Sequence, residues 1–281
     1  MHWVSKAGDA GMPVGKPYDS QSTGFRRATY VDRSGGSVHM GAGICSLDPE
    51  GAIRTHLHSF EESFYVLSGN PVVQIEDQAW VLRPGHFGLI ATGKEHSWRN
   101  NGMEAMRWLE MQAPQPRPVD YGRDTFFVGG DKAKADAANA PDKIEGLLGH
   151  FDEADLPRPG SPAQMEGFNP TTGIALKMFV DRSFGAIHQS LFLLQYAPGA
   201  KIDPHDHAFE ESYFVVSGRV LAVADGRSYD LGPGDAIWTS VGWIHSFENV
   251  GREPVRWIVS QAPLPPAKEV FRFERDWAQY K

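Results

Sequence analysis

Histidine and glutamate residues with the spacing of metal ligands occur in the first half of the chain. His56, His58 and Glu62 lie close together, and a fourth residue, His96, follows at a distance. Successive side chains of a β-strand point to opposite faces, so the two histidines of the His-x-His pair would share one face. Three imidazoles and one carboxylate that converge on one point suit a divalent transition metal. We therefore expect iron, manganese, nickel or zinc here, with two positions of an octahedral shell left open.

The same four residue types recur 149 positions further along the chain, as His205, His207, Glu211 and His245. The offset holds without an insertion from Val31 and Val180 to Gln112 and Gln261. A register kept over this length indicates two copies of one domain. Two copies are too few for a solenoid or a propeller, so each copy is expected to form its own closed core. We expect one metal ion in each.

The elements that must position these residues are predicted to be short strands and turns. Of the 281 residues, 30 are glycine and 20 are proline, and runs rich in Val, Ile, Phe and Trp lie between them. This pattern predicts an all-β protein. The best helix candidate, Lys132–Asn139, lies in a segment bounded by proline-rich stretches that are typical of a linker. We expect domains over residues 1–118 and 165–281 and a connector over 119–164.

The motifs of both halves resemble those of the cupin superfamily. The first half contains Gly51, His56-x-His58-x₃-Glu62-x₆-Gly69, Gly85 and Gly93-x₂-His96-x₃-Asn100. The second contains Gly199-x₅-His205-x-His207-x₃-Glu211-x₆-Gly218, Gly234 and Gly242-x₂-His245-x₃-Asn249. The resemblance implies a bicupin, with two tandem double-stranded β-helix (jelly-roll) barrels and a connector containing little helix. It also implies that each barrel holds a metal site inside its mouth.

The choice among cupin functions is open at this point. The layout, including Tyr196-Ala-Pro-Gly-Ala200, resembles the ureidoglycine aminohydrolase group of bicupins. That group typically has Glu, His, His and Gln at the ligand positions of its second cupin, whereas this chain repeats the His₃Glu set. The unaltered sets resemble cupin dioxygenases instead. We expect a metal-dependent enzyme acting on a small oxygen-rich metabolite, with a dioxygenase preferred. The alternatives are an aminohydrolase-like metal hydrolase and a non-enzymatic small-molecule-binding or storage bicupin.

Four further repeated residues are candidates for contacts with a substrate. Gln112 and Gln261 lie on the last strand of each repeat and could point into the barrel or cap a turn. Arg33 and Arg182 belong to a repeated Val-Asp-Arg-Ser segment, and a guanidinium pairs well with a substrate carboxylate. A structural pair with the preceding aspartate or with a partner subunit is the other interpretation of these arginines.

The two glutamates of each repeat are expected to differ in role. Glu62 and Glu211 would hold the metal, and they could alternatively detach and act as catalytic bases. Glu61 and Glu210 precede them and face the opposite side by strand parity. We expect this second pair on the surface or at an interface.

Charge and cysteine content narrow the range of partners. The chain has 27 Lys and Arg against 35 Asp and Glu, a formal net charge of −8 at pH 7. This acidic balance argues against nucleic acid or an anionic membrane surface as a partner. The single cysteine, Cys45, permits no intrachain disulfide, and the N-terminal residues lack the pattern of a secretory signal. We expect a cytoplasmic protein that binds a small-molecule substrate and forms a homodimer or a higher homo-oligomer.

Overall fold

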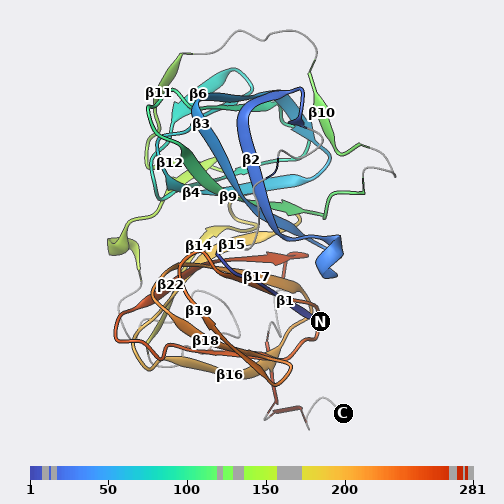
Figure 1. Ribbon diagram of the computed structural model, residues 1–281, viewed down its shortest axis with the longest axis vertical. Helices are drawn as coiled ribbons and strands as arrows, with labels where there is room; N and C mark the ends of the chain where they lie inside the picture. Colours follow the sequence, from blue (N-terminus) through green and yellow to red (C-terminus); the bar gives the residue numbers. More distant parts are fainter. Residues whose placement is uncertain are drawn as a thin grey trace.

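Strands make up most of the part of the chain that the structure describes. The computed structural model describes residues 1–7, 13, 18–118, 123–128, 136–156, 173–265, 271–274 and 276–277. The strands form two barrels stacked along the long axis of the molecule, with the first half of the chain in the upper barrel of Figure 1. The expected all-β class with two tandem barrels is confirmed.

Three groups of strands build the molecule. The N-terminal barrel contains β2 (Ser22–Val31), β3 (Gly41–His58), β4 (Glu61–Ser68), β5 (Val72–Ile75), β6 (Gln78–Val81), β7 (His86–Ile90), β8 (His96–Arg99) and β9 (Met106–Ala113). Between the two barrels in the sequence come β10 (Thr125–Phe127), β11 (Ala137–Asn139), β12 (Lys143–Ile144), β13 (Leu148–His150) and the 3₁₀ turn η4 (Glu153–Asp155). The C-terminal barrel contains β14 (Ile174–Val180), β15 (Ser190–Tyr196), β16 (Lys201–Asp206), β17 (Glu210–Ser217), β18 (Val220–Ala224), β19 (Arg227–Leu231), β20 (Ala236–Thr239), β21 (His245–Glu248), β22 (Val255–Ala262) and β23 (Arg272–Phe273).

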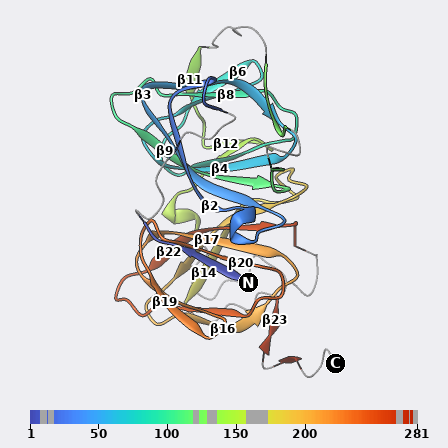
Figure 2. The same ribbon diagram turned by 45° about the vertical axis from the view of Figure 1, so that its right-hand side comes forward.

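The pairing of the strands brings the predicted ligand positions together. In the C-terminal barrel, the sheet β1-β20-β17-β22-β15-β14 faces the sheet β19-β18-β21-β16-β23, and Figure 2 shows both. In the N-terminal barrel the equivalent strands are joined in one sheet, because the 18-residue β3 pairs with both β9 and β8. The end of β3 then meets the start of β8, with His56 opposite His96. The end of β16 meets the start of β21 in the same way, with His205 opposite His245.

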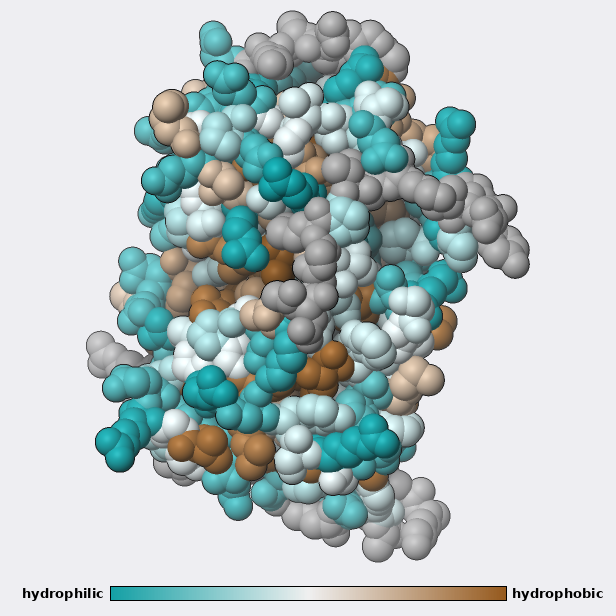
Figure 3. All heavy atoms as spheres, in the orientation of Figure 1, coloured by the Kyte–Doolittle hydropathy of each residue, from teal (hydrophilic) through white to brown (hydrophobic). Residues whose placement is uncertain are grey.

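Buried apolar side chains form a core inside each barrel and a third core between the barrels. The third core contains a stack in which Phe179 of the C-terminal barrel lies 4.3 Å from Phe87 and 5.7 Å from Tyr65 of the N-terminal barrel, measured between ring centroids. The partly buried Ile44 and Val216 pack against this core, and Figure 3 shows apolar surface gathered at mid-height of the molecule. Burial of this shared apolar surface holds the two barrels together.

Two buried glutamates clamp the barrels reciprocally. Glu61 accepts hydrogen bonds from the backbone N–H groups of Ile187 (2.7 Å) and His188 (2.8 Å) in the C-terminal barrel. Its counterpart Glu210 accepts from the equivalent groups of the N-terminal barrel, the N–H of Val38 (2.7 Å) and of His39 (3.1 Å). Of the two positions expected for this pair, the surface or an interface, the structure has both glutamates at the interface between the barrels, and each carboxylate is matched by two backbone donors.

The arm that precedes each barrel pairs with the other barrel. The first strand, β1 (His2–Ser5), adds to the edge of β20 in the C-terminal barrel, with Val4 opposite Ile237. Strand β13 adds to the equivalent edge of β7 in the N-terminal barrel, with Leu148 opposite Gly88. The first residues of the expected 1–118 domain thus join the second barrel's sheet, and the expected connector adds β10 to β13 to the first barrel's sheet. Both edges would otherwise leave backbone hydrogen-bonding groups unpaired.

The helix expected over Lys132–Asn139 is wrong in the part that the structure describes. Ala137–Asn139 forms β11, which pairs in parallel with β6, and residues 132–135 lie outside the described residues. The alanine-rich run has no apolar face to pack as a helix, whereas the edge of β6 offers backbone hydrogen-bond partners. None of the helical elements in the described ranges is long and apolar enough to cross a membrane.

Candidate metal centres

The N-terminal barrel gathers three buried histidines at one point. His56 and His58 end β3, and His96 begins β8. Their ligand nitrogens all lie within 4.8 Å of one another, and each residue is at most 2% exposed. A two-residue turn after His58 leads into β4, where Glu62 brings its carboxylate to the same place. The convergence expected from the sequence is present.

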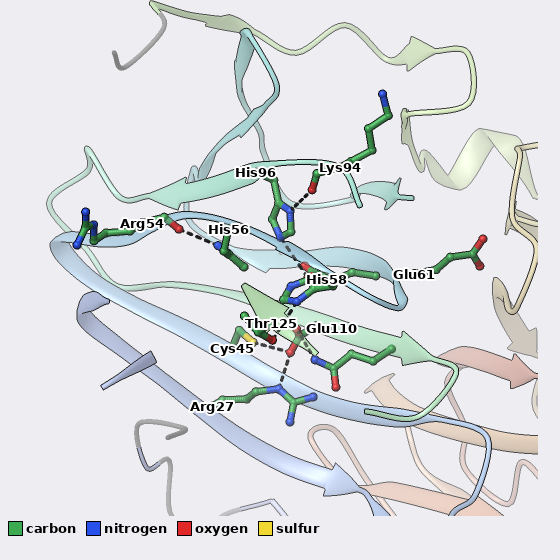
Figure 4. A network of polar contacts seen from close by, with 12 residues as sticks. Arg27, Cys45, Arg54, His56, His58, Glu61, Lys94, His96, Glu110 and Thr125 are labelled. Atoms are coloured by element: carbon green, nitrogen blue, oxygen red, sulfur yellow. Dashed lines mark hydrogen bonds and ion pairs between the residues drawn. The ribbon is translucent and has the colours of Figure 1, made fainter. Parts of the chain in front are cut away.

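Hydrogen bonds fix the orientation of these imidazoles. His56 and His96 each direct Nδ1 at the backbone oxygen of the residue two positions earlier, at 2.7 and 3.0 Å (Figure 4). Nδ1 of His58 lies 3.0 Å from Oγ1 of Thr125, which is supplied by β10. An imidazole that donates from Nδ1 to a carbonyl keeps the lone pair of Nε2 free for a metal. The Nε2 atoms of His58 and His96 are buried, and in the part of the chain that the structure describes the group they face is the carboxylate of Glu62.

The C-terminal barrel repeats this arrangement. His205, His207 and His245 are buried, and their ligand nitrogens also lie within 4.8 Å of one another. Each Nδ1 contacts a backbone oxygen, at 2.8, 2.7 and 2.8 Å respectively. Nε2 of His207 is also buried, and in the described residues it faces the carboxylate of Glu211 at 2.7 Å. Buried imidazole nitrogens aimed at one point beside a carboxylate fit a transition metal, whereas magnesium and calcium prefer oxygen ligands.

A glutamate borders each histidine group. Oε2 of Glu62 lies 3.1 Å from Nε2 of His58 and 3.5 Å from Nε2 of His96. Burial alone would raise the pKa of the Glu62 carboxyl, but its contacts with these two histidines hold the pKa well below its usual value. Oε2 of Glu211 lies 2.7 Å from Nε2 of His207, and its pKa is held down in the same way. Each glutamate is therefore ionised, as a metal ligand must be.

Burial lowers the pKa of a histidine, whereas it raises the pKa of a glutamate. Burial, and then the neighbouring imidazoles, lower the pKa of His56 well below its usual value, and the same causes lower the pKa of His205. A neutral imidazole is the form that binds a metal. His56 and His205 are thus neutral at pH 7 beside an ionised glutamate, a combination of donors that suits a borderline divalent metal.

The predicted substrate contacts fall into two classes. Gln112 and Gln261 are buried inside the barrels, but they have different partners. Nε2 of Gln261 donates to Oε1 of Glu211 at 2.8 Å, whereas Nε2 of Gln112 donates to Oε1 of Glu110 at 2.8 Å. Arg33 and Arg182 are exposed on turns, and in the described residues no contact joins them to either histidine group. Their contact with a substrate stays a prediction.

Sequence reasoning missed a charged network inside the N-terminal barrel. Nε of Arg27 donates to Oε2 of Glu110, and the Sγ–H of Cys45 donates to the same oxygen at 3.3 Å (Figure 4). The contact with Glu110 raises the pKa of Arg27 against the opposing effect of burial, so the guanidinium is charged. The 149-residue offset places Leu176 and Val259 at the positions of the charged pair. Comparing interior positions of the two repeats would have revealed this network.

Sequence reasoning also missed a tyrosine at the C-terminal centre. The hydroxyl of Tyr213 donates to Oε2 of Glu211 at 2.6 Å and lies 3.1 Å from Nε2 of His245. The equivalent position of the N-terminal barrel is Phe64. The difference between phenylalanine and tyrosine at one interior position was the available signal. The two centres therefore have the same set of three histidines and one glutamate, but the residues around each set differ.

Comparison with known proteins agrees with this architecture. The profile of the cupin domain family matches residues 43–111 and 192–260, one match in each barrel. A curated relative, tetracenomycin polyketide synthase protein TcmJ from Streptomyces glaucescens, is 27% identical over 99 residues, which is 35% of this chain and 66% of the relative. The matched part is thus just under two thirds of that protein's length.

Solved structures resemble nearly the whole chain. An oxalate decarboxylase from Lactobacillus farciminis in a formate complex has a TM-score of 0.67 and 16% identity, covering 99% of this chain and 90% of that one. Salicylate 1,2-dioxygenase from Pseudoaminobacter salicylatoxidans, with gentisate adducts, has a TM-score of 0.70 and 16% identity, covering 93% and 81%. At such identities the likeness concerns the fold, and function has to be argued from the site.

Proposed function

The chain is a bicupin, with one cupin domain in each barrel, and we propose that it is a metal-dependent dioxygenase. Its substrate would be a small oxygen-rich metabolite that binds in the N-terminal barrel. In this proposal one divalent transition metal is held in each barrel. The ligands are His56, His58, Glu62 and His96 in the first barrel, and His205, His207, Glu211 and His245 in the second. When bound, the metal would supply open positions at which a substrate oxygen and O₂ can meet.

The observation that carries the proposal is the buried Arg27–Glu110 pair beside the N-terminal ligands. Its two side chains are 13% and 5% exposed. Burying an ion pair is costly and seldom adds stability over apolar residues of similar size. The C-terminal barrel forms the same fold with Leu176 and Val259 at these positions, so the fold does not require the pair. A function in the N-terminal barrel is the simplest reason for keeping it.

The contacts of the pair connect it to the ligand Glu62. Gln112, which donates to Glu110, lies directly opposite Glu62 in the pairing of β4 with β9. Nη2 of Arg27 is buried and has no hydrogen-bond partner in the part of the chain that the structure describes. A buried guanidinium N–H without an acceptor is suited to an anionic oxygen. We therefore assign Arg27 to binding a carboxylate, enolate or phenolate oxygen of the substrate.

Gly43 on β3 makes room for this arginine. A Cβ at Gly43 would lie 2.9 Å from Cζ of Arg27 and 2.7 Å from the backbone oxygen of Ala28. The equivalent residue in the C-terminal barrel is Phe192. The N-terminal barrel thus combines a small residue with a charged side chain, where the C-terminal barrel has only apolar groups. This difference supports the N-terminal barrel as the reactive one.

The remaining polar groups would orient the substrate and handle protons. Glu110 fixes Arg27 through Nε and accepts hydrogen bonds from Gln112 and Cys45, so the guanidinium is held rigidly. Burial, and then the neighbouring Glu110, raise the pKa of the Cys45 thiol well above its usual value, so the thiol keeps its proton. Preorganised donors of this kind align a substrate without reorganising during the reaction.

Oxygen uptake tests the proposal. Protein loaded anaerobically with Fe(II) should consume O₂ when mixed with a substrate from a panel of β-diketones, flavonols and aromatic diols. We expect His56→Ala to abolish oxygen uptake. His205→Ala makes the same chemical change in the other barrel and serves as the control; once shown to be folded, it should retain most of the uptake. No uptake with any compound, together with ammonia release from ureidoglycine, would instead indicate the aminohydrolase-like alternative. Failure of both reactions would favour a binding or storage protein.

A further inference from the structure

We propose that Tyr213 closes the metal site of the C-terminal barrel, so that this barrel binds its metal without an open position for a second molecule. The inference rests on the metal binding in the proposed function and extends it to a division of roles between the barrels. The hydroxyl oxygen of Tyr213 lies 2.6 Å from Oε2 of Glu211 and 3.1 Å from Nε2 of His245. These are two of the four ligand atoms, so the phenol oxygen is a fifth polar atom at the centre.

The pairing of β17 with β20 explains why the ring takes this position. Tyr213 lies opposite Ile237, whereas its counterpart Phe64 lies opposite Gly88. A Cβ at Gly88 would lie only 2.5 Å from Cζ of Phe64, so the glycine leaves the space into which that ring leans. Ile237 occupies the equivalent space, and the ring of Tyr213 is directed toward His245. One glycine-to-isoleucine difference and one phenylalanine-to-tyrosine difference thus distinguish the two centres.

The ligand carboxylate of the C-terminal barrel is held on both oxygens. Tyr213 donates to Oε2 of Glu211, and Gln261 donates to Oε1 at 2.8 Å while accepting from Ser190 at 3.0 Å. In the N-terminal barrel the equivalent glutamine, Gln112, donates to Glu110 instead. Glu211 is therefore fixed in place by two donors. A carboxylate fixed in this way cannot move aside to admit another ligand.

Little space borders the carboxylate side of this centre in the part of the chain that the structure describes. A cavity of about 10 Å³ borders Glu211 and His205, room for roughly one water molecule. Its walls are mostly apolar and aromatic. A larger cavity of about 440 Å³ borders His245, but the imidazole of His245 is fully buried. Within the described residues, the four ligands, the phenol oxygen and this small space leave no open position for substrate, O₂ or nitric oxide.

Nitric oxide is a probe that separates open from closed iron sites, since it binds Fe(II) only where a position is free. The full-length protein would be loaded with Fe(II), its metal content measured, and its Fe(II)–nitric oxide adduct counted by electron paramagnetic resonance. We expect about two irons and about one adduct per chain. Tyr213→Phe should raise the count to about two without changing the iron content. Tyr196→Phe, the same chemical change in the wall of the same cavity, should leave it at one.

Two histidine variants assign the signal to a barrel. His56→Ala should remove the adduct of the unmodified protein, and His205→Ala should remove one iron while leaving the adduct count at one. Two adducts per chain before any substitution, or one adduct in a Tyr213→Phe protein that still binds two irons, would overturn the inference. An iron content unaffected by His205→Ala would overturn it as well. None of these counts depends on turnover, so they stand apart from the oxygen-uptake test of the proposed function.

Discussion

Variants of the buried pair of Arg27 and Glu110 should separate its effect on stability from its effect on oxygen uptake. Replacing Glu110 alone by leucine would leave the guanidinium buried without its carboxylate, and replacing Arg27 alone by methionine would leave the carboxylate unpaired. With side chains only 13% and 5% exposed, either single change should cost about 3–5 kcal/mol of unfolding free energy. The glutamate change should be the worse of the two, because it also removes the acceptor for Gln112 and Cys45.

The double variant should behave differently. With both charges replaced by apolar residues of similar size, no buried charge is left unpaired, so the double variant should be more stable than either single variant. Because Gln112 and Cys45 still lack their acceptor, we expect it to remain about 1–3 kcal/mol below the original. The C-terminal barrel, with Leu176 and Val259 at these positions, shows that the fold accepts this composition. Oxygen uptake should nevertheless remain lost, because the donor for the substrate's anionic oxygen is gone.

Urea unfolding followed by tryptophan fluorescence, together with oxygen uptake by the Fe(II)-loaded protein, would measure both quantities. A double-mutant cycle isolates the energy of the pair from the effect of each residue alone. The reasoning would be refuted if the double variant consumed O₂ at the original rate. It would also fail if each single variant were as stable as the double one, since the pair would then carry no unpaired-charge penalty.

Three further predictions follow from the same structure. Glu61→Ala and Glu210→Ala should each lower the unfolding free energy by about 2–3 kcal/mol, because two backbone donors lose a charged acceptor; equal stability in urea unfolding would contradict the clamp. His56→Ala and His205→Ala should each lower the bound metal by one equivalent per chain in elemental analysis; unchanged metal content would contradict the ligand assignment. Gly43→Ala should lower the unfolding free energy by about 1–3 kcal/mol, because its Cβ would lie 2.7 Å from a backbone oxygen. It should also reduce oxygen uptake, because the Cβ would lie 2.9 Å from Cζ of Arg27; unchanged uptake would contradict the idea that Gly43 makes room for Arg27.

The duplicated motifs were sufficient to predict the fold and the two histidine groups. The parity of the His-x-His pair and the repeated offset are local features, and the strands follow them: His56 meets His96 and His205 meets His245. Parity also predicted that Glu61 faces away from Glu62, on the surface or at an interface, although it did not specify the contact between the barrels. In each case one strand's alternation decides which side chains share a face.

Features that depend on two distant segments were not predictable in this way. The adjacent Arg26 and Arg27 are chemically alike, yet Arg26 pairs with Asp48 on the surface while Arg27 enters the barrel. The exchange of β1 onto β20 depends on a free sheet edge in the other half of the chain. The run at Ala137–Asn139 has helical composition, but the edge of β6 offers it strand partners instead.

The same limit applies to the differences between the two centres. Tyr213 is directed at Glu211 and His245, and it lies opposite Ile237, whereas its counterpart Phe64 lies opposite Gly88. Neither Tyr213 nor Ile237 belongs to the motifs that identify the fold. Such differences can be located by aligning the two repeats position by position. The informative positions are interior ones where one repeat has a polar residue and the other an apolar residue.

The most direct test of the central claim is a crystal structure of the Fe(II)-loaded protein, with anomalous diffraction measured at the iron edge. We expect two anomalous peaks per chain, each bounded by three histidine Nε2 atoms and one glutamate oxygen. The peak in the N-terminal barrel should have open positions facing Arg27, and the peak in the C-terminal barrel should lie against Tyr213. Absence of iron from the N-terminal histidines, or iron bound there with Arg27 shielded from it, would contradict the proposed function.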